Sequence, residues 1–460
     1  MTDWQKYRRK SKVVWTADGQ MPEIEPYTKV KHELLESYLS DWVETIIGNR
    51  SYTPNPKVTI VDGFCGGGIY KDGEDVWEGS PIRIIRAIEN GWKAVKERKP
   101  YQNLDIAYLF VDRRQEHTES LEQEIRKHGY AYLLENKKCI VRTGYFEDQL
   151  NECLEWVKDR GGHSFFFLDP FGSVDLPGMA RAILSLKGTE VLLNHMHNDA
   201  FVRPIVKAFK ENRGWQYLDE YNLRKYYSFF AEYDNLPNLE RQTLAHNAAL
   251  QLYRERSNPR FAWTFAFMKN RDSVYYYLVH LSNHPTAISV MRRNLWMYNN
   301  LDYQFHYGVF GLGYRTIEDF EKNFQLLNIE DRNRKICQEK LVEQLDRFIF
   351  NSNSFSFKKI YEGTIDHHPA TREDYMSVIH QGIIDGEWEM ERDGKIACSS
   401  RLTNRDIIRP AKAKQLVLFP GKVSGRIPPK RKVNVANAAQ DKSNFFGKSR
   451  AHNTSSKEKP

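Results

Sequence analysis

The stretch that decides the fold is Val58-Thr59-Ile60-Val61-Asp62-Gly63-Phe64-Cys65-Gly66-Gly67-Gly68. Its apolar, β-branched start predicts a short buried strand, which ends in an acidic residue and turns through glycines. Residues without a Cβ atom let the backbone approach a ligand closely, and a carboxylate at a strand end accepts hydrogen bonds from ribose hydroxyls. The segment therefore predicts a strand that runs into a cofactor-binding loop.

Downstream of this loop, strands and helices alternate. Four further buried strands are predicted at residues 107–111, 139–142, 164–168 and 190–194, with helical patterns at 82–96, 117–128, 146–158 and 179–186 between them. This order predicts an α/β fold with a mostly parallel sheet and helices on both faces. Residues 261–268 and 273–281 are predicted to finish the sheet as an antiparallel hairpin, after a tyrosine-rich helical insertion at about 204–256.

The flanking segments divide the chain further. Residues 1–27 look irregular, and a helix capped by Thr28 then opens a predicted sheet domain at 28–310. At 331–410, two helices precede strands 388–391 and 395–399, which pair across Asp393-Gly394. The second helix starts at a capping-box pattern, Thr371 to Asp374. Helices followed by a small hairpin predict a winged-helix-like module.

Charge is concentrated at the end of the chain. Residues 401–460 hold 15 lysines and arginines against 3 acidic residues, a net charge of +12, whereas residues 1–400 hold 53 against 57, a net charge of −4. Beyond Gly421 the apolar periodicity stops, so 421–460 is predicted to be a disordered basic tail. Such a tail suits binding to nucleic-acid phosphates, and a solubilising extension is the alternative.

Composition excludes several classes of protein. The chain of 460 residues is 40% hydrophobic and 28% charged, which is ordinary for a globular protein of two or three domains. No stretch of about 18 apolar residues is present, and the amino terminus lacks a secretory signal, so we expect a cytoplasmic protein without membrane contact. The five cysteines are scattered without a CxxC spacing, which indicates neither disulfides nor a cysteine zinc site.

The glycine loop suggests a particular cofactor. Phe64 stands where a dinucleotide-binding motif has its first glycine, and no lysine follows at the place that a phosphate-gripping loop requires. This departure favours S-adenosylmethionine, held by Asp62, Gly63, Phe64, Gly66 and Gly68. The alternative is a tight turn between strand and helix without a ligand.

The next two strands offer further cofactor contacts. Asp112 ends the second strand, where an acid is placed to accept hydrogen bonds from ribose hydroxyls. Tyr145, after the third strand, offers an aromatic wall for adenine, together with Phe146. The alternatives are a solvated turn at Asp112 to Arg114 and a purely structural core role for the two aromatic residues.

The fourth strand ends in Asp169-Pro170-Phe171-Gly172. Methylating an exocyclic amine requires an acceptor for its N–H hydrogens and an aromatic ring that stacks on a flat substrate. We therefore expect Asp169, Pro170 and Phe171 to form the catalytic, acceptor side of the site. This turn resembles the DPFG or DPYG turn of transfer-RNA guanine dimethyltransferases. The alternative is an aspartate that caps the next helix.

Two other polar clusters are expected at the same crevice. His195 and His197 follow the fifth strand, and no third ligand lies at zinc spacing, so they are interpreted as wall residues and no metal site is predicted. Ser282, Asn283 and His284 end the hairpin and are expected at the rim of the site.

Taken together, residues 27–300 resemble the three-Cys-motif partner protein (TcmP) family of bacteria and phages. The residues that carry the resemblance are Lys31-His32-Glu33-Leu34-Leu35, Tyr38-Leu39, Trp42, Val61 to Gly68, Glu78-Gly79-Ser80-Pro81, Asp112, Leu168 to Gly172 and Ser282-Asn283-His284-Pro285. The family usually has Ala and Gly-Pro-Gly where this chain has Cys65 and Gly66-Gly67-Gly68, and replacing proline by Gly67 loosens the loop.

The resemblance implies a Rossmann-like sheet of the class I methyltransferase type and a working link to a radical S-adenosylmethionine enzyme with a three-cysteine motif. Two functions are compatible with it. One is a methyltransferase that uses S-adenosylmethionine on a nucleic-acid base or another planar amine, with the polymer held by the basic tail and the winged-helix-like module. The other is a non-catalytic partner protein that binds the cofactor and works with the radical enzyme, in a phage- or defence-related role.

Overall fold

The computed structural model describes residues 14–16, 18–48, 55–170, 174–197, 199–211, 223–270, 273–301, 312–316, 329–350 and 354–411. All of these described residues belong to one compact unit. The predicted basic tail at 421–460 and the catalytic candidate Phe171 lie outside the described residues.

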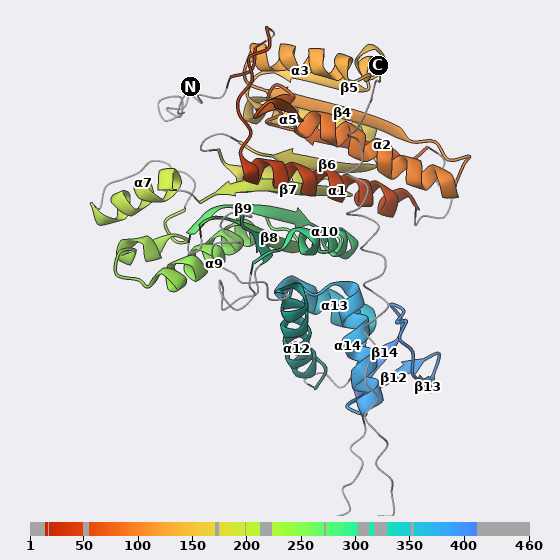
Figure 1. Cartoon of the computed structure of the whole chain (residues 1–460). Helices are drawn as coiled ribbons and strands as arrows, with labels where there is room; N and C mark the ends of the chain where they lie inside the picture. The colour runs from red at the N-terminus through yellow and green to blue at the C-terminus, as the bar shows by residue number, and fades with distance from the viewer. Residues whose placement is uncertain are drawn as a thin grey trace, which may run out of the picture. The chain divides into compact units, whose positions relative to one another are not determined.

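An eight-stranded sheet forms the centre of the first unit, in the order β10-β8-β9-β7-β6-β1-β4-β5 (Figure 1). The five strands from β7 to β5 in this order are parallel, and β9 is antiparallel to both β7 and β8. The predictions of a mostly parallel sheet and of an antiparallel hairpin are therefore confirmed. The hairpin does not finish the sheet as predicted, because β10 pairs in parallel with β8 and forms the edge. The strands are β1 (Lys57–Asp62), β4 (Asp105–Asp112), β5 (Cys139–Thr143), β6 (His163–Leu168), β7 (Thr189–Met196), β8 (Phe261–Asn270), β9 (Ser273–Ser282) and β10 (Leu312–Tyr314).

One hairpin was not predicted. Strands β2 (Ile69–Asp72) and β3 (Asp75–Glu78) pair with each other directly after the glycine loop, and α2 begins only at Ser80. Both strands are short and largely exposed, so their sequence lacks the apolar run that marks the central strands. The glycine loop therefore leads into a hairpin before it reaches the helix.

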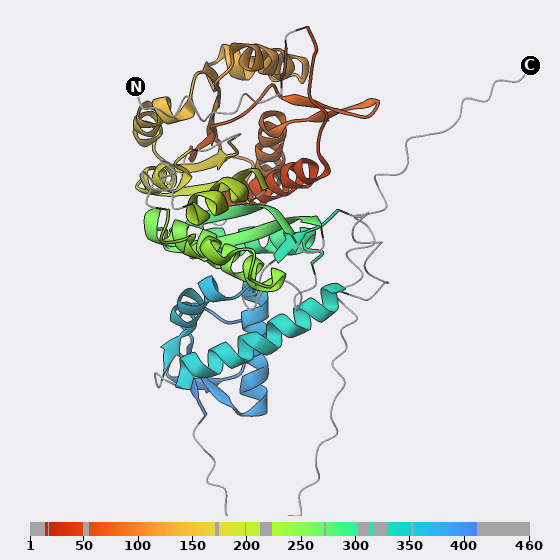
Figure 2. The same cartoon turned by 90° about the vertical axis from the view of Figure 1, so that its left-hand side faces the viewer.

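Two helical layers cover the sheet. Helices α1, α2, α3 and α10 share one hydrophobic cluster with inward residues of the strands, and α5, α6 and α9 share the other. Figure 1 shows α1, α2 and α10 in front of the strands, and the view in Figure 2 separates the red α1 and orange α2 from the yellow helices on the other face. The helices of these layers are α1 (Pro26–Gly48), α2 (Ser80–Arg98), α3 (Gln115–Lys127), α5 (Phe146–Arg160), α6 (Leu176–Leu184), α9 (Asn238–Arg256) and α10 (Pro285–Tyr298), with the short α4 (Ala131–Glu135) between α3 and β5.

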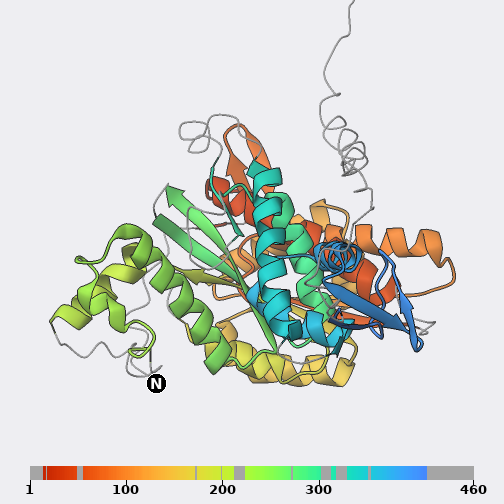
Figure 3. The same ribbon diagram turned by 90° about the horizontal axis from the view of Figure 1, so that it is seen from below.

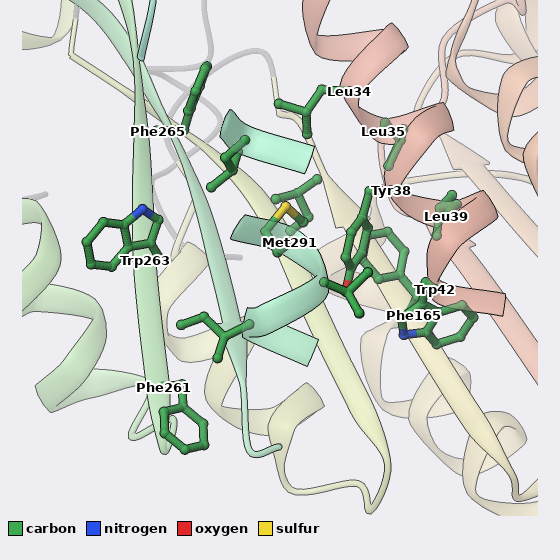
Figure 4. Close-up of a cluster of buried hydrophobic side chains, with 14 of the residues drawn as sticks. Leu34, Leu35, Tyr38, Leu39, Trp42, Phe165, Phe261, Trp263, Phe265 and Met291 are labelled. Atoms are coloured by element: carbon green, nitrogen blue, oxygen red, sulfur yellow. The ribbon is translucent and has the colours of Figure 1, made fainter. Parts of the chain in front are cut away.

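Helix α1 packs its apolar face across the middle of the sheet. Tyr38 and Trp42 of this helix lie against Phe165 of β6 (Figure 4). The polar ends of both side chains donate hydrogen bonds to the buried carboxylate of Glu190, and Trp42 Nε1 lies 2.7 Å from Glu190 Oε1. Since buried polar groups are stable only when partnered, this network fixes α1 on the strands.

The predicted insertion is helical in its described part. It contains α7 (Asp199–Lys210), the 3-10 helix η2 (Ser228–Glu232) and α9. A separate hydrophobic cluster around Tyr227 and Phe230 holds these elements together. The insertion therefore has a small core of its own beside the sheet.

The C-terminal module consists of three helices and a four-stranded antiparallel sheet in the order β11-β14-β12-β13 (Figure 3, module in cyan and blue). Its elements are α12 (Ile329–Phe350), β11 (Phe355–Ser356), α13 (Phe357–Thr364), η3 (Ile365–His367), α14 (Arg372–Asp385), β12 (Trp388–Arg392), β13 (Lys395–Ala397) and β14 (Ile407–Pro410). The predicted capping box of Thr371 and Asp374 and the turn at Asp393-Gly394 are both present. The assignment of this module to the winged-helix class stays a prediction.

Buried polar contacts connect α10 to this module. The Arg292 guanidinium is fully buried, donates to the carbonyl oxygens of Ile365 and Ala370 and lies 4.3 Å from the Trp263 ring.

Among the helices in the described part of the chain, none has the length and apolar character that crossing a bilayer requires.

Candidate functional site

A cleft lies at the carboxyl ends of β1, β4, β5 and β6. It encloses about 850 Å³, part of it open to solvent. Strands β4 and β5 follow on one side of β1, whereas β6 and β7 follow on the other, so the cleft lies where the strand order reverses, the usual ligand site of open α/β sheets. Its walls are formed by Trp15, His32, Gly63, Phe64, Gly66, Tyr70, Ser80, Asp112, Arg113, His117, Gly144, Tyr145, Phe146, Glu147, Asp169, Pro170 and Val174.

Backbone hydrogen bonds hold the glycine loop against the neighbouring strands. Gly63 N donates to Phe167 O at 3.1 Å, and Cys65 N donates to Val111 O at 2.9 Å. Gly66 has a φ of +62°, a backbone conformation that residues with a Cβ rarely adopt. At Gly63, a Cβ would lie 2.8 Å from the Phe146 ring. Packing against Phe146 at Gly63 and the positive φ at Gly66 therefore favour glycine at these two positions, and the cofactor contact of the loop stays a prediction.

Asp62 lies beneath this loop and does not line the cleft. Its carboxylate is fully buried and accepts hydrogen bonds from Ser80 Oγ at 2.7 Å and from Phe64 N at 3.1 Å. Burial raises its pKa to about 7, against the lowering effect of these hydrogen bonds, and the nearby Asp169 and Asp112 raise it further. Asp62 was predicted to contact the cofactor, but its carboxylate does not line the cleft. It instead supports the glycine loop from below, through its hydrogen bonds to Phe64 N and Ser80 Oγ.

Gly68 also supports the loop from outside the cleft. It has a φ of +89°, and its carbonyl oxygen accepts a hydrogen bond from Gly79 N at 2.7 Å. A Cβ at this position would lie 2.9 Å from Leu121 of α3. Gly68 was predicted to contact the cofactor, but it packs against Leu121 instead. The reason is that Gly68 directly precedes the β2–β3 hairpin and so lies past the part of the loop that lines the cleft.

Asp112 lines the cleft at the end of β4, as predicted. Its Oδ2 accepts a hydrogen bond from Gly66 N at 3.3 Å, and its Oδ1 accepts one from Arg114 N at 2.9 Å. His117 Nδ1 lies 2.9 Å from the same Oδ1. One carboxylate thus connects the glycine loop to the turn after β4 and faces the cleft.

Tyr145 and Phe146 have separate roles. Tyr145 lines the cleft directly before α5. Phe146 is 1% exposed and packs beneath Gly63, with its ring 5.9 Å from the Phe64 ring. Tyr145 is therefore positioned for a flat ligand, and Phe146 belongs mainly to the core that supports the loop.

Asp169 and Pro170, which the sequence predicts on the acceptor side, both line the cleft. The Asp169 carboxylate forms an ion pair with Lys31 of α1 and accepts a hydrogen bond from Asn194 Nδ2 at 2.7 Å. The alternative in which Asp169 caps the next helix is wrong, because Asp175 caps α6 by accepting from Gly178 N. Asp169 lies in the same cleft as Asp112 and the glycine loop.

Several lining residues were missed by the sequence analysis. Trp15, from the segment before α1, is 2% exposed, and its indole N–H donates to the carbonyl oxygen of Ile69. Its ring packs on Gly67 and lies 4.7 Å from the His117 ring. This segment reaches the loop through backbone hydrogen bonds to Lys71 of β2, so only the fold brings Trp15 to the cleft.

His32 and Tyr70 form the opposite part of the wall. Burial, followed by the charges of Lys31 and Arg83, holds the pKa of His32 well below its usual value. Its Nδ1 accepts a hydrogen bond from Trp77 Nε1 at 3.3 Å. The pKa of Tyr70 is raised, first by burial and then by the carboxylates of the site. The cleft therefore presents a neutral imidazole and a neutral phenol beside its acidic groups.

His195, which lies in β7, and His197, which follows this strand, do not line this cleft. His195 lines a second cavity of about 300 Å³ between α6, η2 and α9, where its ring nitrogens lie 3.1 Å from the hydroxyls of Tyr253 and Tyr227. Burial lowers the pKa of His195 to about 3 and that of His197 to about 4. The prediction that they form the wall of the cofactor crevice is wrong.

The predicted rim at Ser282, Asn283 and His284 is also wrong. Strand β9 runs antiparallel to β7, and Ser282 pairs with Glu190 near the start of β7. The carboxyl end of β9 therefore lies at the amino ends of the parallel strands, away from the cleft.

Within the described residues, no group of three or more His, Cys, Asp or Glu side chains is arranged to hold a metal ion.

No protein-family model matches the chain, and no curated protein matches its sequence. Among solved structures, it is similar to a Legionella pneumophila protein of family DUF519, with 11% identity over 58% of this chain and 92% of that chain and a TM-score of 0.33. An O-methyltransferase from Bacillus cereus has 12% identity over 56% of this chain and 82% of that chain, with a TM-score of 0.27. A methyltransferase from Geobacter sulfurreducens has 12% identity over 58% of this chain and 93% of that chain, with a TM-score of 0.25. Similarities of this size establish neither an activity nor a substrate.

Proposed function

We propose that this protein is a methyltransferase that uses S-adenosylmethionine and acts on a nucleic-acid base or another planar amine. One observation carries the proposal: a single cleft contains both the glycine loop with Asp112 and the Asp169-Pro170 turn. Group transfer requires donor and acceptor in one enclosed space, with their reacting atoms in near contact.

The cofactor half of the cleft suits the donor. Gly63 and Gly66 line the cleft with backbone, since a Cβ at either position would lie against the ring of Phe146 or Trp15. Asp112 faces the cleft, where it can accept hydrogen bonds from a ribose, and Tyr145 offers a flat wall for adenine. The carboxylates of this region also favour a ligand that carries a positive charge. When bound, S-adenosylmethionine supplies an electrophilic methyl group on a sulfonium.

The acceptor half suits an amine. Asp169 can accept an N–H hydrogen bond from the substrate, which orients the nitrogen, while Pro170 fixes the turn. Lys31 and Asn194 hold the carboxylate from the other side. An amine bound here would lie in the same cleft as the cofactor, which is the geometry that an exocyclic amine of a base requires.

One observation favours the alternative of a non-catalytic partner protein. Both Asp169 oxygens already have protein partners, namely Lys31 and Asn194, so a substrate amine must share or displace them. In that case the protein binds the cofactor and cooperates with a radical enzyme, as the resemblance to the three-Cys-motif partner family implies.

Calorimetry and methyl transfer test the proposal in two steps. Titration of the purified full chain with S-adenosylmethionine and with S-adenosylhomocysteine is expected to give one site per chain, and no binding at millimolar ligand would reject both functions. Transfer of labelled methyl to nucleic acid is then measured for the wild type, Asp169→Ala and the exposed-site control Asp159→Ala. Binding without any transfer, in the wild type as in Asp169→Ala, favours the partner function.

A further inference from the structure

The loop at residues 401–406 in the C-terminal module gathers cationic side chains from three segments. Asn404 lies at its centre. Its carbonyl oxygen accepts a hydrogen bond from Lys358 N at 3.3 Å, and its Oδ1 accepts one from Arg372 Nη2 at 2.8 Å. The amino-terminal ends of α13 and α14 therefore begin beside this loop and add partial positive charge to it.

The loop is held in one conformation by Asp406. This buried carboxylate accepts hydrogen bonds from Thr403 N at 2.6 Å and from Thr403 Oγ1 at 2.9 Å, and Arg392 forms an ion pair with it. The pKa of Asp406 is lowered, mainly by the hydrogen bond from Arg392. The negative charge of Asp406 is thus neutralised by Arg392 inside the module and is not exposed beside Asn404.

Five cations belong to this loop or to the first turns of α13 and α14, and we call them the 401–405 basic surface: Lys358, Lys359, Arg372, Arg401 and Arg405. The Lys359 ammonium lies 4.0 Å from the Phe355 ring. All are exposed except Arg372, whose guanidinium lies 4.8 Å from the Phe357 ring. In the described part of the chain, no acidic side chain pairs with Lys359, Arg401 or Arg405. Lys358 lies 3.9 Å from Glu362, which also pairs with Arg260, and Glu373 is the exposed acid beside Arg372.

The outer face of α14 lacks this charge. Its exposed residues are Glu373, Ser377, Gln381, Ile384 and Asp385. On the neighbouring strands, Arg409 is paired with both Glu389 and Glu391. In the described residues 354–411 of the module, exposed cations available for a polyanion are therefore found beside the loop and at Lys395 of β13, and not along α14.

We propose that the 401–405 basic surface binds the phosphate backbone of a nucleic acid. Charge complementarity carries the proposal, because cations from three segments match a row of phosphates that releases counterions on binding. Arginines also suit phosphate oxygens through their paired N–H donors. Such contacts position a polymer without reading its sequence. The proposal does not depend on methyl transfer in the cleft.

The test measures the salt dependence of binding by the full chain, with a labelled 20-base-pair DNA duplex and a labelled single-stranded RNA as separate probes. Fluorescence anisotropy between 50 and 200 mM NaCl compares the wild type with Arg401→Gln/Arg405→Gln. We expect the double variant to bind at least about tenfold more weakly to one of the probes. On duplex DNA, its slope of log affinity against log salt should fall by about two, at roughly 0.9 per phosphate contact.

A matched control removes two exposed cations elsewhere. Arg126 and Lys127 of α3 are half or more exposed, and Arg126→Gln/Lys127→Gln is expected to keep wild-type affinity and slope. Every variant keeps the basic tail, so its contribution is the same throughout. Lys359→Gln serves as an independent variant, with an expected slope change of about one.

Three results would overturn the proposal. One is a wild-type slope in both surface variants, which would place the phosphate contacts elsewhere in the chain. The second is the absence of binding to either probe. The third is preferential binding of poly-glutamate in competition, which would indicate an acidic protein partner. Calorimetric binding of S-adenosylmethionine by Arg401→Gln/Arg405→Gln, measured alongside, separates a failure of this surface from a failure of the cleft.

Discussion

Lys31 of α1 and Asp169 at the end of β6 form an ion pair in the wall of the cleft. The two residues are 138 positions apart in the chain, and their side chains are 5% and 17% exposed. Asn194 of β7 binds the other carboxylate oxygen. The Asp169 carboxylate is thus held by α1 and β7. Through Lys31 and His32, the opening helix of the chain takes part in the wall of the cleft.

Removing Lys31 should destabilise the protein. We expect Lys31→Met to lower the free energy of unfolding by about 3 kcal/mol, because it leaves a largely buried carboxylate without its counter-charge. Urea denaturation measures the change. Lys31→Met/Asp169→Asn should recover most of the loss, whereas Lys29→Met, which breaks a more exposed pair with Asp72, should cost less than about 1 kcal/mol. Strictly additive single losses would contradict a coupled pair.

The buried Asp62 should make stability depend on pH. Its pKa is raised to about 7 by burial, whereas an unfolded aspartate titrates near ~3.9. Between these values the folded state binds a proton that the unfolded state does not, so stability falls as pH rises from about 4 to about 7, by at most about 4 kcal/mol. Unfolding of the wild type and of Asp62→Asn is measured at pH 5 and pH 8. The asparagine variant should lack this component, and parallel pH profiles would show that Asp62 does not titrate in this range.

The central sheet could be predicted because each of its long strands is a local apolar run. Runs such as Val58 to Val61 are buried on both faces, and in a parallel sheet every such strand points its carboxyl end to the same edge. The positions of Asp112 and Asp169 at one cleft follow from that rule. The antiparallel direction of β9 breaks it, which explains why Ser282 to His284 were placed at the wrong edge.

The rest of the site depends on contacts that local sequence does not encode. Trp15 lies in an irregular segment, and it reaches the glycine loop only because that segment pairs with β2. His195 follows a correctly predicted strand, yet its side chain faces α9 and η2. Side chains alternate between the two faces of a strand, and the sequence does not state which face meets the cofactor.

We expect that only glycine fits at position 67, because the Trp15 ring packs directly against it. An alanine Cβ at Gly67 would lie 2.2 Å from Trp15 Cγ, so Gly67→Ala should cost about 2 kcal/mol of stability through overpacking. In a Trp15→Ala background the same substitution should cost far less, because the obstructing ring is absent. Gly73→Ala is the control: open space surrounds this glycine and its φ is +62°, so only a backbone cost of about 1 kcal/mol is expected. An equal cost of Gly67→Ala in both backgrounds, measured by urea unfolding, would contradict the contact.

Asp112 should determine cofactor affinity more than stability. Asparagine keeps one acceptor oxygen but loses the charge and the second acceptor, whereas Gly66 N and Arg114 N bond to different oxygens of Asp112. A ribose hydroxyl therefore loses a charged acceptor in the variant. A charge-assisted hydrogen bond contributes about 1.5–3 kcal/mol, which corresponds to a roughly 10- to 100-fold weaker affinity of Asp112→Asn for S-adenosylmethionine. Calorimetry measures this affinity, and Asp159→Asn, on the exposed side of α5, should bind as the wild type does. Unchanged affinity in Asp112→Asn, with the fold intact by circular dichroism, would place the ribose elsewhere and remove the cofactor half of the proposed site.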